Sequence, residues 1–203
     1  MPDTSTTPID RVLPRHRALI FDCDGTLADS MPVHWRAWTD TFAERGWATF
    51  PVYREYMTWG GISGEQVARR AAGEAVSDAQ VADAVVAKQE HYLRLTPTIQ
   101  PIEPVLAVAR EYRGRLPMAV ATGSRRRSVT QTLNTVQAFD WFDAVVSSDD
   151  VTHHKPHPET YLKAAQALGM APEDCLAFED APPGVDAARA AGMEVVDVRD
   201  YGL

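Results

Sequence analysis

Five short apolar runs constrain the fold of this chain more than any other feature of its sequence. Each run is continuous rather than alternating, as in strands that are buried on both faces. Helix-like segments lie between most of the runs, which is the pattern of a parallel sheet built from right-handed crossovers. The sequence therefore predicts an α/β fold with a doubly wound parallel sheet, whose strands lie at residues 18–21, 118–121, 144–147, 176–178 and 195–198.

Three of the segments between these runs carry signals typical of helix ends. In each, a proline stands near the start and a glycine follows just past the end. Proline suits the first turn, where its missing N–H leaves no hydrogen bond unmade, and glycine readily adopts the left-handed conformation that ends many helices. We expect helices at residues 104–113, 158–168 and 183–191.

The first two predicted strands lie much farther apart in the sequence than one crossover helix requires. Two Ser-x-x-Gln capping boxes fall between them, and a further serine precedes a helical spacing of aromatic residues. These candidate helix starts are Ser63, Ser77 and Ser30. We therefore expect a flexible tail, a core domain and an inserted helical cap domain, at residues 1–15, at 16–29 together with 99–203, and at 30–98 respectively.

The charge balance and the distribution of apolar residues exclude two classes of partner. The chain has 203 residues, with 20 Lys and Arg against 28 Asp and Glu, and its one run of three basic residues is 125–127. It lacks the broad basic face that nucleic acid binding requires. No apolar stretch approaches the roughly 20 residues of a membrane span, and no apolar signal core follows the N-terminus. We expect a cytoplasmic protein without nucleic-acid or membrane partners.

Polar residues follow four of the predicted strands. Because the carboxyl ends of parallel strands meet at one edge of a sheet, where open α/β sheets bind ligands, we expect these residues to share a site. An Asp-Gly pair by itself would equally fit a hairpin turn, but here several strand ends carry polar groups. The candidate site residues are Asp22, Asp24, Thr122, Gly123, Lys155, Glu179 and Asp180.

Four of these candidates are carboxylates that would crowd one pocket. Two carboxylates about 4 Å apart repel by about 4 kcal/mol at an effective dielectric constant of 20, so the pocket calls for a cation. Oxygen ligands without cysteine or paired histidine at ligand spacing favour Mg²⁺ over Zn²⁺. The sequence therefore predicts a magnesium site among Asp22, Asp24, Glu179 and Asp180.

Taken together, the four strand-end segments resemble, in order and spacing, the four motifs of the haloacid dehalogenase superfamily of phosphotransferases. The resemblance covers the chain after residue 15 and implies a Rossmann-like core. It implies that Asp22 is the nucleophile that becomes an aspartyl phosphate, and that Asp24 is a general acid and then a general base. Asp24 also argues against dehalogenation, because a halide leaves without protonation.

The resemblance implies further roles at the other strand ends. Thr122, Gly123 and Lys155 would bind the transferring phosphoryl group, where charge collects in the transition state. Mg²⁺ would be held by Asp22, by Asp180 and by the main-chain carbonyl of Asp24, with Glu179 in support. All of these groups belong to one chain, so a monomer suffices for the site.

The insertion resembles the helical cap of a subgroup that includes β-phosphoglucomutase and small sugar-phosphate phosphatases. Several segments are closer to bacterial phosphatases of the fructose-1-phosphate/6-phosphogluconate type, namely residues 32–38, 153–158, 178–180 and 196–199. This likeness implies a Mg²⁺-dependent phosphatase of small phosphorylated sugars. Contacts to the sugar are expected from cap residues His34, Gly61, Ile62 and Lys88.

Two alternatives remain open at this point. A mutase would return the phosphoryl group to a sugar, but by resemblance mutases carry an arginine after a Gly-x-Ser segment, and here Gly64 occupies that position. Lys88 would replace that arginine only in part, as a point charge. A non-catalytic phosphate- or metal-sensing module is the second alternative, although it would need neither Asp24 nor a cap that excludes water.

Other polar and aromatic residues have simpler interpretations. We interpret His153 and His154 as solvated loop residues rather than metal ligands, and residues 125–127 as a solvated helix start. Trp35 and Trp38 fit the cap's own core. The two cysteines, Cys23 and Cys175, are too few for a disulfide framework and are expected to be free, buried thiols.

Overall fold

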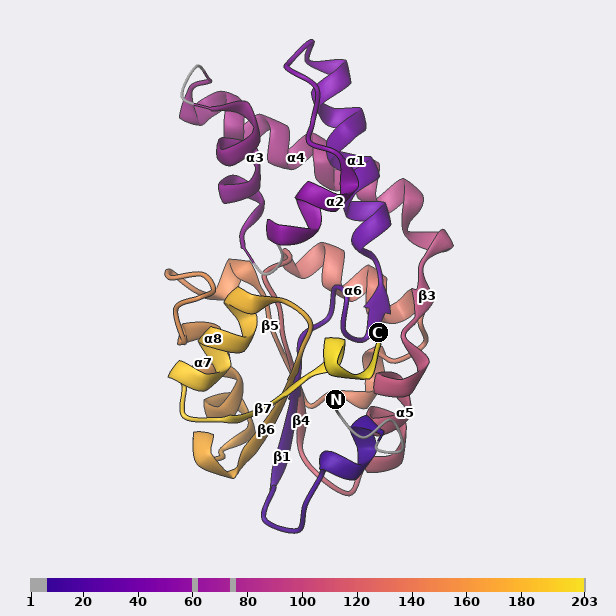
Figure 1. Cartoon of the computed structure of the whole chain (residues 1–203), viewed down its shortest axis with the longest axis vertical. Coiled ribbons are helices and arrows are strands. Elements are labelled where there is room, and N and C mark those ends of the chain that lie inside the picture. Colours follow the sequence, from indigo (N-terminus) through magenta and orange to yellow (C-terminus); the bar gives the residue numbers. More distant parts are fainter. Residues whose placement is uncertain (1–6, 60–61, 74–75, 203) are drawn as a thin grey trace.

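The computed structural model describes residues 7–59, 62–73 and 76–202. Its centre is a five-stranded parallel sheet in the order β5-β4-β1-β6-β7, which has the first strand in the middle (Figure 1). The prediction of a doubly wound parallel sheet is confirmed. Each predicted strand forms within about two residues of its expected bounds, as β1 (Ala18–Phe21), β4 (Met118–Ala121), β5 (Ala144–Val146), β6 (Cys175–Glu179) and β7 (Glu194–Asp197).

Helices cover both faces of the sheet, because successive strand residues point to opposite sides. Leu19 and Phe21 pack in one hydrophobic cluster with α5 (Glu103–Tyr112) and α6 (Arg126–Thr135). Ala18 and Ile20 pack in another with α7 (Glu159–Leu168) and α8 (Pro182–Ala190). The three predicted crossover helices are α5, α7 and α8, each displaced by one residue from its expected start.

The register of the central strands places their ends level with one another. Phe21, the last residue of β1, pairs with Val120 on one side and with Phe178 on the other. The residues that follow these positions, Asp22 and Glu179 among them, therefore emerge at the same edge of the sheet. This is the edge that faces the inserted helices (Figure 1).

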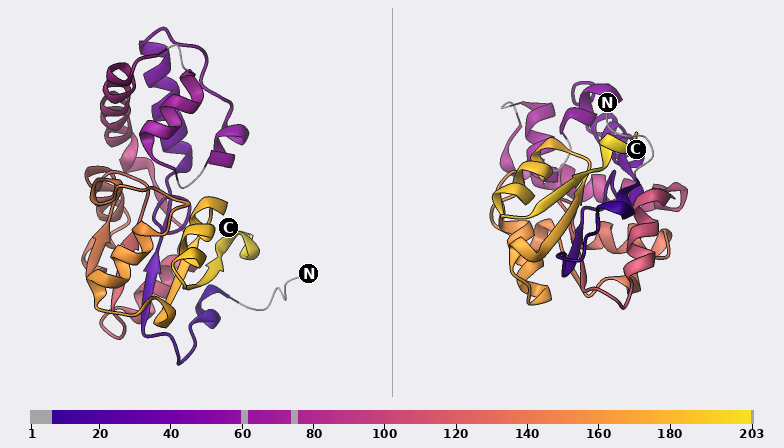
Figure 2. Two further views of the ribbon diagram at one scale, coloured as in Figure 1. Left: turned by 90° about the vertical axis from the view of Figure 1, so that its left-hand side faces the viewer. Right: turned by 60° about the horizontal axis from the view of Figure 1, so that its bottom comes forward.

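The insertion leaves and re-enters the core through a two-residue antiparallel pair, β2 (Ala28–Asp29) with β3 (Gln100–Pro101). Beyond it the chain forms a helical unit above the sheet (Figure 2), with a core that includes Trp38, Phe42 and Phe50. The helices of this unit are α1 (Met31–Glu44), α2 (Tyr53–Tyr56), α3 (Gly64–Ala72) and α4 (Asp78–Leu95). Short 3₁₀ helices are η1 (Pro8–Arg11), η2 (Met57–Trp59), η3 (Thr96–Thr98), η4 (Phe139–Trp141), η5 (Ser148–Asp150), η6 (Pro172–Asp174) and η7 (Val198–Tyr201).

The predicted helix caps form at two of three positions. Ser63 and Ser77 each accept a hydrogen bond from the main-chain N–H of the glutamine three residues on, which confirms the capping boxes. Ser30 precedes α1 but does not cap it, because its hydroxyl donates to Asp24 instead. Strand β2 ends at Asp29, and α1 begins two residues later at Met31.

The start of the chain is more ordered than the expected flexible tail at residues 1–15. Residues 8–11 form a 3₁₀ helix, and Ile9 and Val12 pack against the cluster on the α5 face of the sheet. These two apolar side chains give the stretch a place on the core, and flexibility of residues 1–15 stays a prediction. Residues 1–6 lie outside the described part of the chain.

The helices can be compared with the length and apolar character that a membrane span requires. Within residues 7–59, 62–73 and 76–202, every helix is either too short or too polar to cross a bilayer.

Candidate active site

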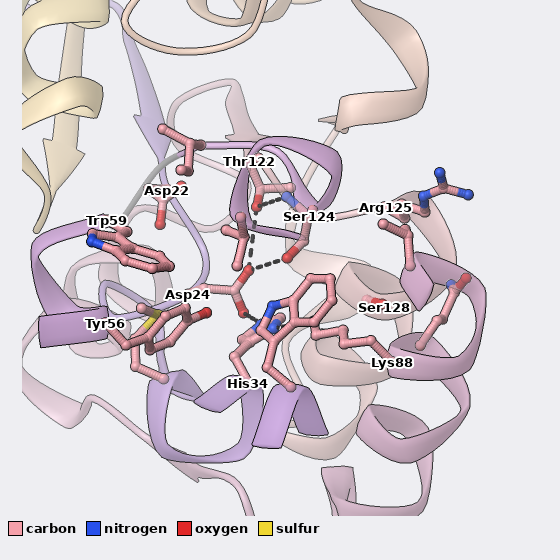
Figure 3. A pocket seen from close by; sticks show the side chains of 18 residues that line it. Asp22, Asp24, His34, Tyr56, Trp59, Lys88, Thr122, Ser124, Arg125 and Ser128 are labelled. Carbon is pink, nitrogen blue, oxygen red and sulfur yellow. Dashed lines mark hydrogen bonds and ion pairs between the residues drawn. The ribbon is translucent and has the colours of Figure 1, made fainter. Parts of the chain in front are cut away.

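A cavity lies between the edge of the sheet and the inserted helices, and the loops after β1 and β4 line it (Figure 3). Asp22, Asp24, Thr122 and Gly123 line it from the sheet side. Across from them, the inserted unit contributes mainly aromatic and apolar side chains together with a few polar ones. These are Met31, His34, Trp38, Tyr56, Trp59, Ile62, Gly64, Val67, Val85, Lys88 and Gln89.

Lys155 is buried at the centre of the sheet edge. Its Nζ donates to Asp22 Oδ1 at 2.7 Å, to Glu179 Oε1 at 2.6 Å and to the main-chain carbonyl of Ala121 at 3.1 Å. Burial alone would lower the pKa of Lys155, but the two facing carboxylates outweigh it and raise that pKa well above its ordinary value. The ammonium group therefore stays charged and is fixed beside Asp22.

Three carboxylates meet next to this lysine. One oxygen from each of Asp22, Glu179 and Asp180 lies within 4.8 Å of the others. Burial raises the pKa of Asp22 well above its ordinary value, although Lys155 opposes the shift. Burial and the charge of Glu179 raise the pKa of Asp180 to about 7. Such crowding is costly for anions alone and is relieved by a cation.

Glu179 holds this arrangement together. Its Oε2 accepts the main-chain N–H groups of Asp180 at 2.8 Å and Ala181 at 2.9 Å, while Oε1 accepts from Lys155 and from the Tyr161 hydroxyl at 3.1 Å. Both oxygens are thus committed to protein donors. Among the three carboxylates, Asp22 and Asp180 are therefore the ones that could hold a metal.

Two glycines make room for these carboxylates. A Cβ at Gly25 would overlap the carboxylate of Asp180, and Gly25 also has a φ of +89°, a conformation that other residues rarely adopt. A Cβ at Gly184, in the first turn of α8, would overlap the carboxylate of Glu179. The Thr26 hydroxyl donates to Asp180 Oδ1 at 3.1 Å and fixes its orientation.

The side chain of Asp24 lies apart from the carboxylate cluster, in contrast to the predicted crowding of four. It accepts hydrogen bonds from Ser124 Oγ at 2.5 Å and from His34 Nε2 at 2.9 Å (Figure 3). It also accepts one from Ser30 Oγ at 2.6 Å. Burial opposes ionisation, but His34 and the two serines hold the pKa of Asp24 well below its usual range. If Asp24 contributes to a metal site, it does so through its main chain.

His34 connects Asp24 to Lys88. Its imidazole stacks on the Tyr92 ring at 4.1 Å, and its Nδ1 lies 2.5 Å from Lys88 Nζ. Burial and the nearby charge of Lys88 lower the pKa of His34, and burial lowers the pKa of Lys88 to about 8. Near neutral pH we assign a charged Lys88 that donates to Nδ1 and a neutral imidazole whose Nε2–H is donated to Asp24.

Other predicted residues reach the cavity to different extents. Thr122 and Gly123 line it, and Thr122 Oγ1 lies 3.4 Å from Asp24 Oδ2. Ile62 lines it from the inserted unit, whereas Gly61 lies outside the described residues.

Sequence reasoning missed several polar partners in and around this site. They are Ser30, Ser124 and Tyr161, which donate to Asp24 or Glu179. Ser124 directly follows the Thr-Gly pair and was open to detection, whereas Ser30 carries the signal of a helix cap. Tyr161 lies on the buried face of α7, whose apolar pattern gives no hint of the role of its hydroxyl.

Two of the three arginines at the start of α6 connect the core to the inserted helical unit. Arg125 lines the cavity and pairs with Glu65 of α3, and Arg127 Nη1 lies 2.6 Å from Glu90 of α4. Arg126 pairs with Asp150 of the core, and Arg127, whose side chain is 63% exposed, fits the predicted solvated helix start as well as Arg126 does. Trp38 lies in the helical core as predicted.

The two cysteines are free and buried, which confirms the interpretation of Cys23 and Cys175 as unpaired thiols.

Comparisons with known proteins agree with this arrangement. The model of the haloacid dehalogenase-like hydrolase family matches residues 16–192. The chain is 37% identical over 191 residues to fructose-1-phosphate phosphatase YqaB of Escherichia coli, covering 91% of this chain and 97% of that protein. It is 37% identical over 190 residues to protein CbbY of Rhodobacter capsulatus, covering 89% and 84%. The crystal structure of CbbY from Rhodobacter sphaeroides in complex with phosphate superposes with a TM-score of 0.79 at 30% identity, covering 89% and 84%.

Proposed function

The chain belongs to the family of haloacid dehalogenase-like hydrolases, and on that premise we propose that it is a Mg²⁺-dependent phosphatase of small sugar phosphates that forms an aspartyl phosphate on Asp22. One observation carries the proposal: two aspartates, two residues apart at the end of β1, have opposite surroundings. Asp22 sits against Lys155 and the other carboxylates, while Asp24 is held by three hydrogen-bond donors of its own. Paired carboxyl groups in contrasting environments are the usual basis for dividing two roles.

Asp22 is suited to attack phosphorus. Lys155 holds one of its oxygens, favours the ionised form and stands where it would meet a phosphoryl oxygen. Thr122 and Gly123 line the same end of the cavity and would contact the remaining phosphoryl oxygens. Fixed donors of this kind stabilise charge as it develops in the transition state, without having to reorganise.

Asp24 is suited to proton transfer at the other side of the phosphoryl group. As a general acid it would protonate the leaving sugar oxygen, and as a general base it would take a proton from the attacking water. The donors around it lower the pKa of Asp24 and stabilise the ionised form, which serves the second step and opposes the protonated form that the first step needs. Proton transfer by a positioned group typically contributes about 10² to 10⁴ in rate.

We propose that Asp22, Asp180 and the main-chain carbonyl of Asp24 hold the Mg²⁺ ion, with Glu179 orienting the loop of Asp180. The donor set fits a hard cation because it consists of oxygens. When bound, the ion would offset the repulsion between the anionic nucleophile and the anionic phosphate ester. The raised pKa values of Asp22 and Asp180 agree with a pocket arranged for positive charge.

We propose fructose 1-phosphate or 6-phosphogluconate as the type of substrate. The similarity to the fructose-1-phosphate phosphatase YqaB supports this class, and the cavity has both aromatic walls and polar groups. Trp38, Tyr56 and Trp59 would pack against the apolar C–H faces of a sugar, and Lys88 with Gln89 would contact its hydroxyl groups.

We further propose that the protein acts as a monomer, since all the described site residues come from one chain. A cytoplasmic location stays a prediction.

A mutase is the second candidate. Gly64 lines the cavity at the position where an arginine would grip a second phosphate, which favours water as the acceptor. One observation supports the mutase: Arg125 also lines the cavity and pairs with Glu65, so a distal phosphate would compete for it. Conversion of β-glucose 1-phosphate in the presence of a sugar bisphosphate primer would identify this activity.

The proposal is tested by phosphate release from a panel of sugar phosphates. Wild-type protein should release phosphate with Mg²⁺ and lose this activity in EDTA. Asp22→Asn should abolish release while the protein stays folded by circular dichroism, because the change deletes the attacking charge and little volume. Phosphate release that persists in Asp22→Asn would place the nucleophile elsewhere, and turnover unaffected by EDTA would refute the metal. Tight phosphate binding without turnover would favour the alternative of a non-catalytic phosphate- or metal-sensing module.

A further inference from the structure

The loop that carries Lys155 holds a second group of metal-ligating side chains on its outer surface. One ring nitrogen each of His153 and His157 and a carboxylate oxygen of Glu159 lie within 4.8 Å of one another. In the described part of the chain these residues are separate from those that line the cavity. We propose that His153, His157 and Glu159 form a binding site for a divalent transition-metal ion of the zinc class.

The cluster is already close to the spacing that an ion needs. The two imidazole rings lie 4.6 Å apart between centroids with a tilt of 34°, and His153 Nδ1 is 2.9 Å from Glu159 Oε2. Ligand atoms that share a tetrahedral zinc ion are about 3.4 Å apart, given metal–nitrogen distances near 2.0–2.1 Å. The adjustment that remains is small: a pair at the 4.8 Å limit would have to close by about 1.4 Å, and the His153–Glu159 pair at 2.9 Å would have to open by about 0.5 Å. Rotation of the His153 side chain, which is 63% exposed, can supply it.

The carboxylate of Glu159 is oriented by the protein before any metal arrives. Lys163 and the main-chain N–H groups of Thr152 and His153 donate to it. Lys163 Nζ lies 2.8 Å from Oε1, whereas the His153 ring contacts Oε2. An ion on the Oε2 side therefore leaves the lysine pair in place.

The donor set separates this site chemically from the pocket at the sheet edge. Two imidazole nitrogens with one carboxylate suit Zn²⁺, Cu²⁺ or Ni²⁺, whereas a set of oxygens alone suits Mg²⁺. Three protein ligands leave at least one coordination position of the ion to water, so we expect the ion in this loop to be accessible to solvent. The interpretation of His153 as merely solvated is replaced by this proposal.

A metal ion bound to His153, His157 and Glu159 would restrain the loop that carries Lys155. His153 and His157 lie on either side of Lys155, whose Nζ bonds Asp22 and Glu179. An ion that joins them spans this segment and ties it to the start of α7, where Glu159 stands. Because the ion binds the folded loop, it should raise the thermal midpoint of the protein.

The same loop supplies a matched control. His154 lies between the two proposed ligands but is not part of the cluster, and its Nδ1 is buried without a hydrogen-bond partner in the described part of the chain. A substitution at His154 changes the same residue type in the same loop and leaves the proposed ligand set intact. His154→Gln is therefore the control for His153→Gln and His157→Gln.

The proposal is tested by equilibrium dialysis against Zn²⁺ in excess Mg²⁺, with metal counted per chain. Wild type and His154→Gln should retain one more Zn²⁺ than His157→Gln and His153→Gln, with affinity at that site falling at least tenfold in the two ligand variants. The difference isolates the loop ion, because zinc bound in the carboxylate pocket is common to all four proteins.

A second readout uses no activity and separates this proposal from the proposed function. Zn²⁺ should raise the thermal midpoint of wild type and His154→Gln and have a smaller effect on both ligand variants. His153→Gln serves if His157→Gln fails to fold. Equal zinc retention by His154→Gln and both ligand variants would overturn the proposal, as would a wild-type protein that holds no ion beyond the carboxylate pocket.

Discussion

At the scale of single residues, the site depends on glycines such as Gly25, where a carboxylate occupies the space that a side chain would need. Gly25 and Gly192 both have a φ of +89°, but only Gly25 faces a carboxylate, that of Asp180. A methyl group at Gly192 would meet nothing within 4 Å. Alanine substitutions at these two glycines therefore separate the effect of backbone strain, which both share, from the effect of steric overlap with Asp180, which occurs only at Gly25.

Gly25→Ala and Gly192→Ala should each destabilise the protein by about 1 kcal/mol through left-handed backbone strain. Only Gly25→Ala should also weaken activation by Mg²⁺, at least tenfold, because its methyl group displaces Asp180. Urea unfolding measures the first effect, and Mg²⁺ titration of phosphate release measures the second. Equal Mg²⁺ dependence in the two variants would show that Asp180 tolerates the displacement.

Lys88 gives a prediction about pH. Burial lowers its pKa from 10.5 to about 8, so the folded protein releases this proton at a lower pH than the unfolded chain does. Between these two values the unfolded state binds more protons, and stability rises with pH. The free energy of unfolding of wild type, relative to Lys88→Met, should therefore increase from pH 7.5 to 10.5 by up to about 3 kcal/mol.

Urea unfolding of both proteins at several pH values measures this difference. Buried tyrosines also titrate at high pH, and comparison with Lys88→Met removes their common contribution. A constant difference across the range would mean that Lys88 keeps its proton in the folded state.

At the scale of elements, two serines that precede helices have different partners. Ser77 caps α4 by accepting from the Gln80 N–H, whereas Ser30 ahead of α1 donates to Asp24. A helix cap is a local pattern, but the alternative partner of Ser30 becomes visible only once the β1 loop is folded against α1. This is why sequence reasoning interpreted both serines as caps.

Ser77→Ala should cost about 1 kcal/mol of stability and leave turnover unchanged, because it removes a cap far from the cavity. Ser30→Ala should reduce turnover roughly tenfold, since it removes one charge-assisted hydrogen bond from Asp24. Urea unfolding and steady-state rates on one substrate measure both variants. Turnover unaffected by Ser30→Ala would show that His34 and Ser124 suffice to hold Asp24.

At the scale of the whole molecule, the inserted unit and the sheet share part of one core. Ala37 of α1 and Tyr92 of α4 belong to the hydrophobic cluster on the α5 face of the sheet, and the Tyr92 hydroxyl bonds Thr132 of α6 at 2.6 Å. The arginine pairs of α6 add only exposed contacts, which contribute little to stability. The shared core predicts cooperative unfolding.

Four of the five tryptophans, all except Trp141, lie in the inserted segment. Trp141→Phe therefore confines tryptophan fluorescence to that unit, while circular dichroism reports on both. The two signals should give the same urea midpoint, as expected for one cooperative transition. A fluorescence midpoint well below that of circular dichroism would show that the helical unit unfolds alone.

The sequence predicts the sheet well because buried parallel strands appear as continuous apolar runs, and it predicts the site residues because they follow those runs. It predicts the partners of Asp24 and Glu179 less well. Ser124 follows a predicted site residue, but its partner Asp24 lies 100 positions away in the chain, and Tyr161 reaches Glu179 from the first turn of α7. Such contacts arise from packing and leave no local pattern.

The junction at β2 and β3 has a consequence for engineering by exchange of parts. A cap from a relative could be grafted between Asp29 and Gln100 with only two splice points, and it would import a new sugar pocket. It would also remove His34, which contacts Asp24 of the recipient, and Lys88, which contacts His34. A chimera that changes specificity without losing rate must therefore transplant an equivalent histidine and lysine along with the pocket.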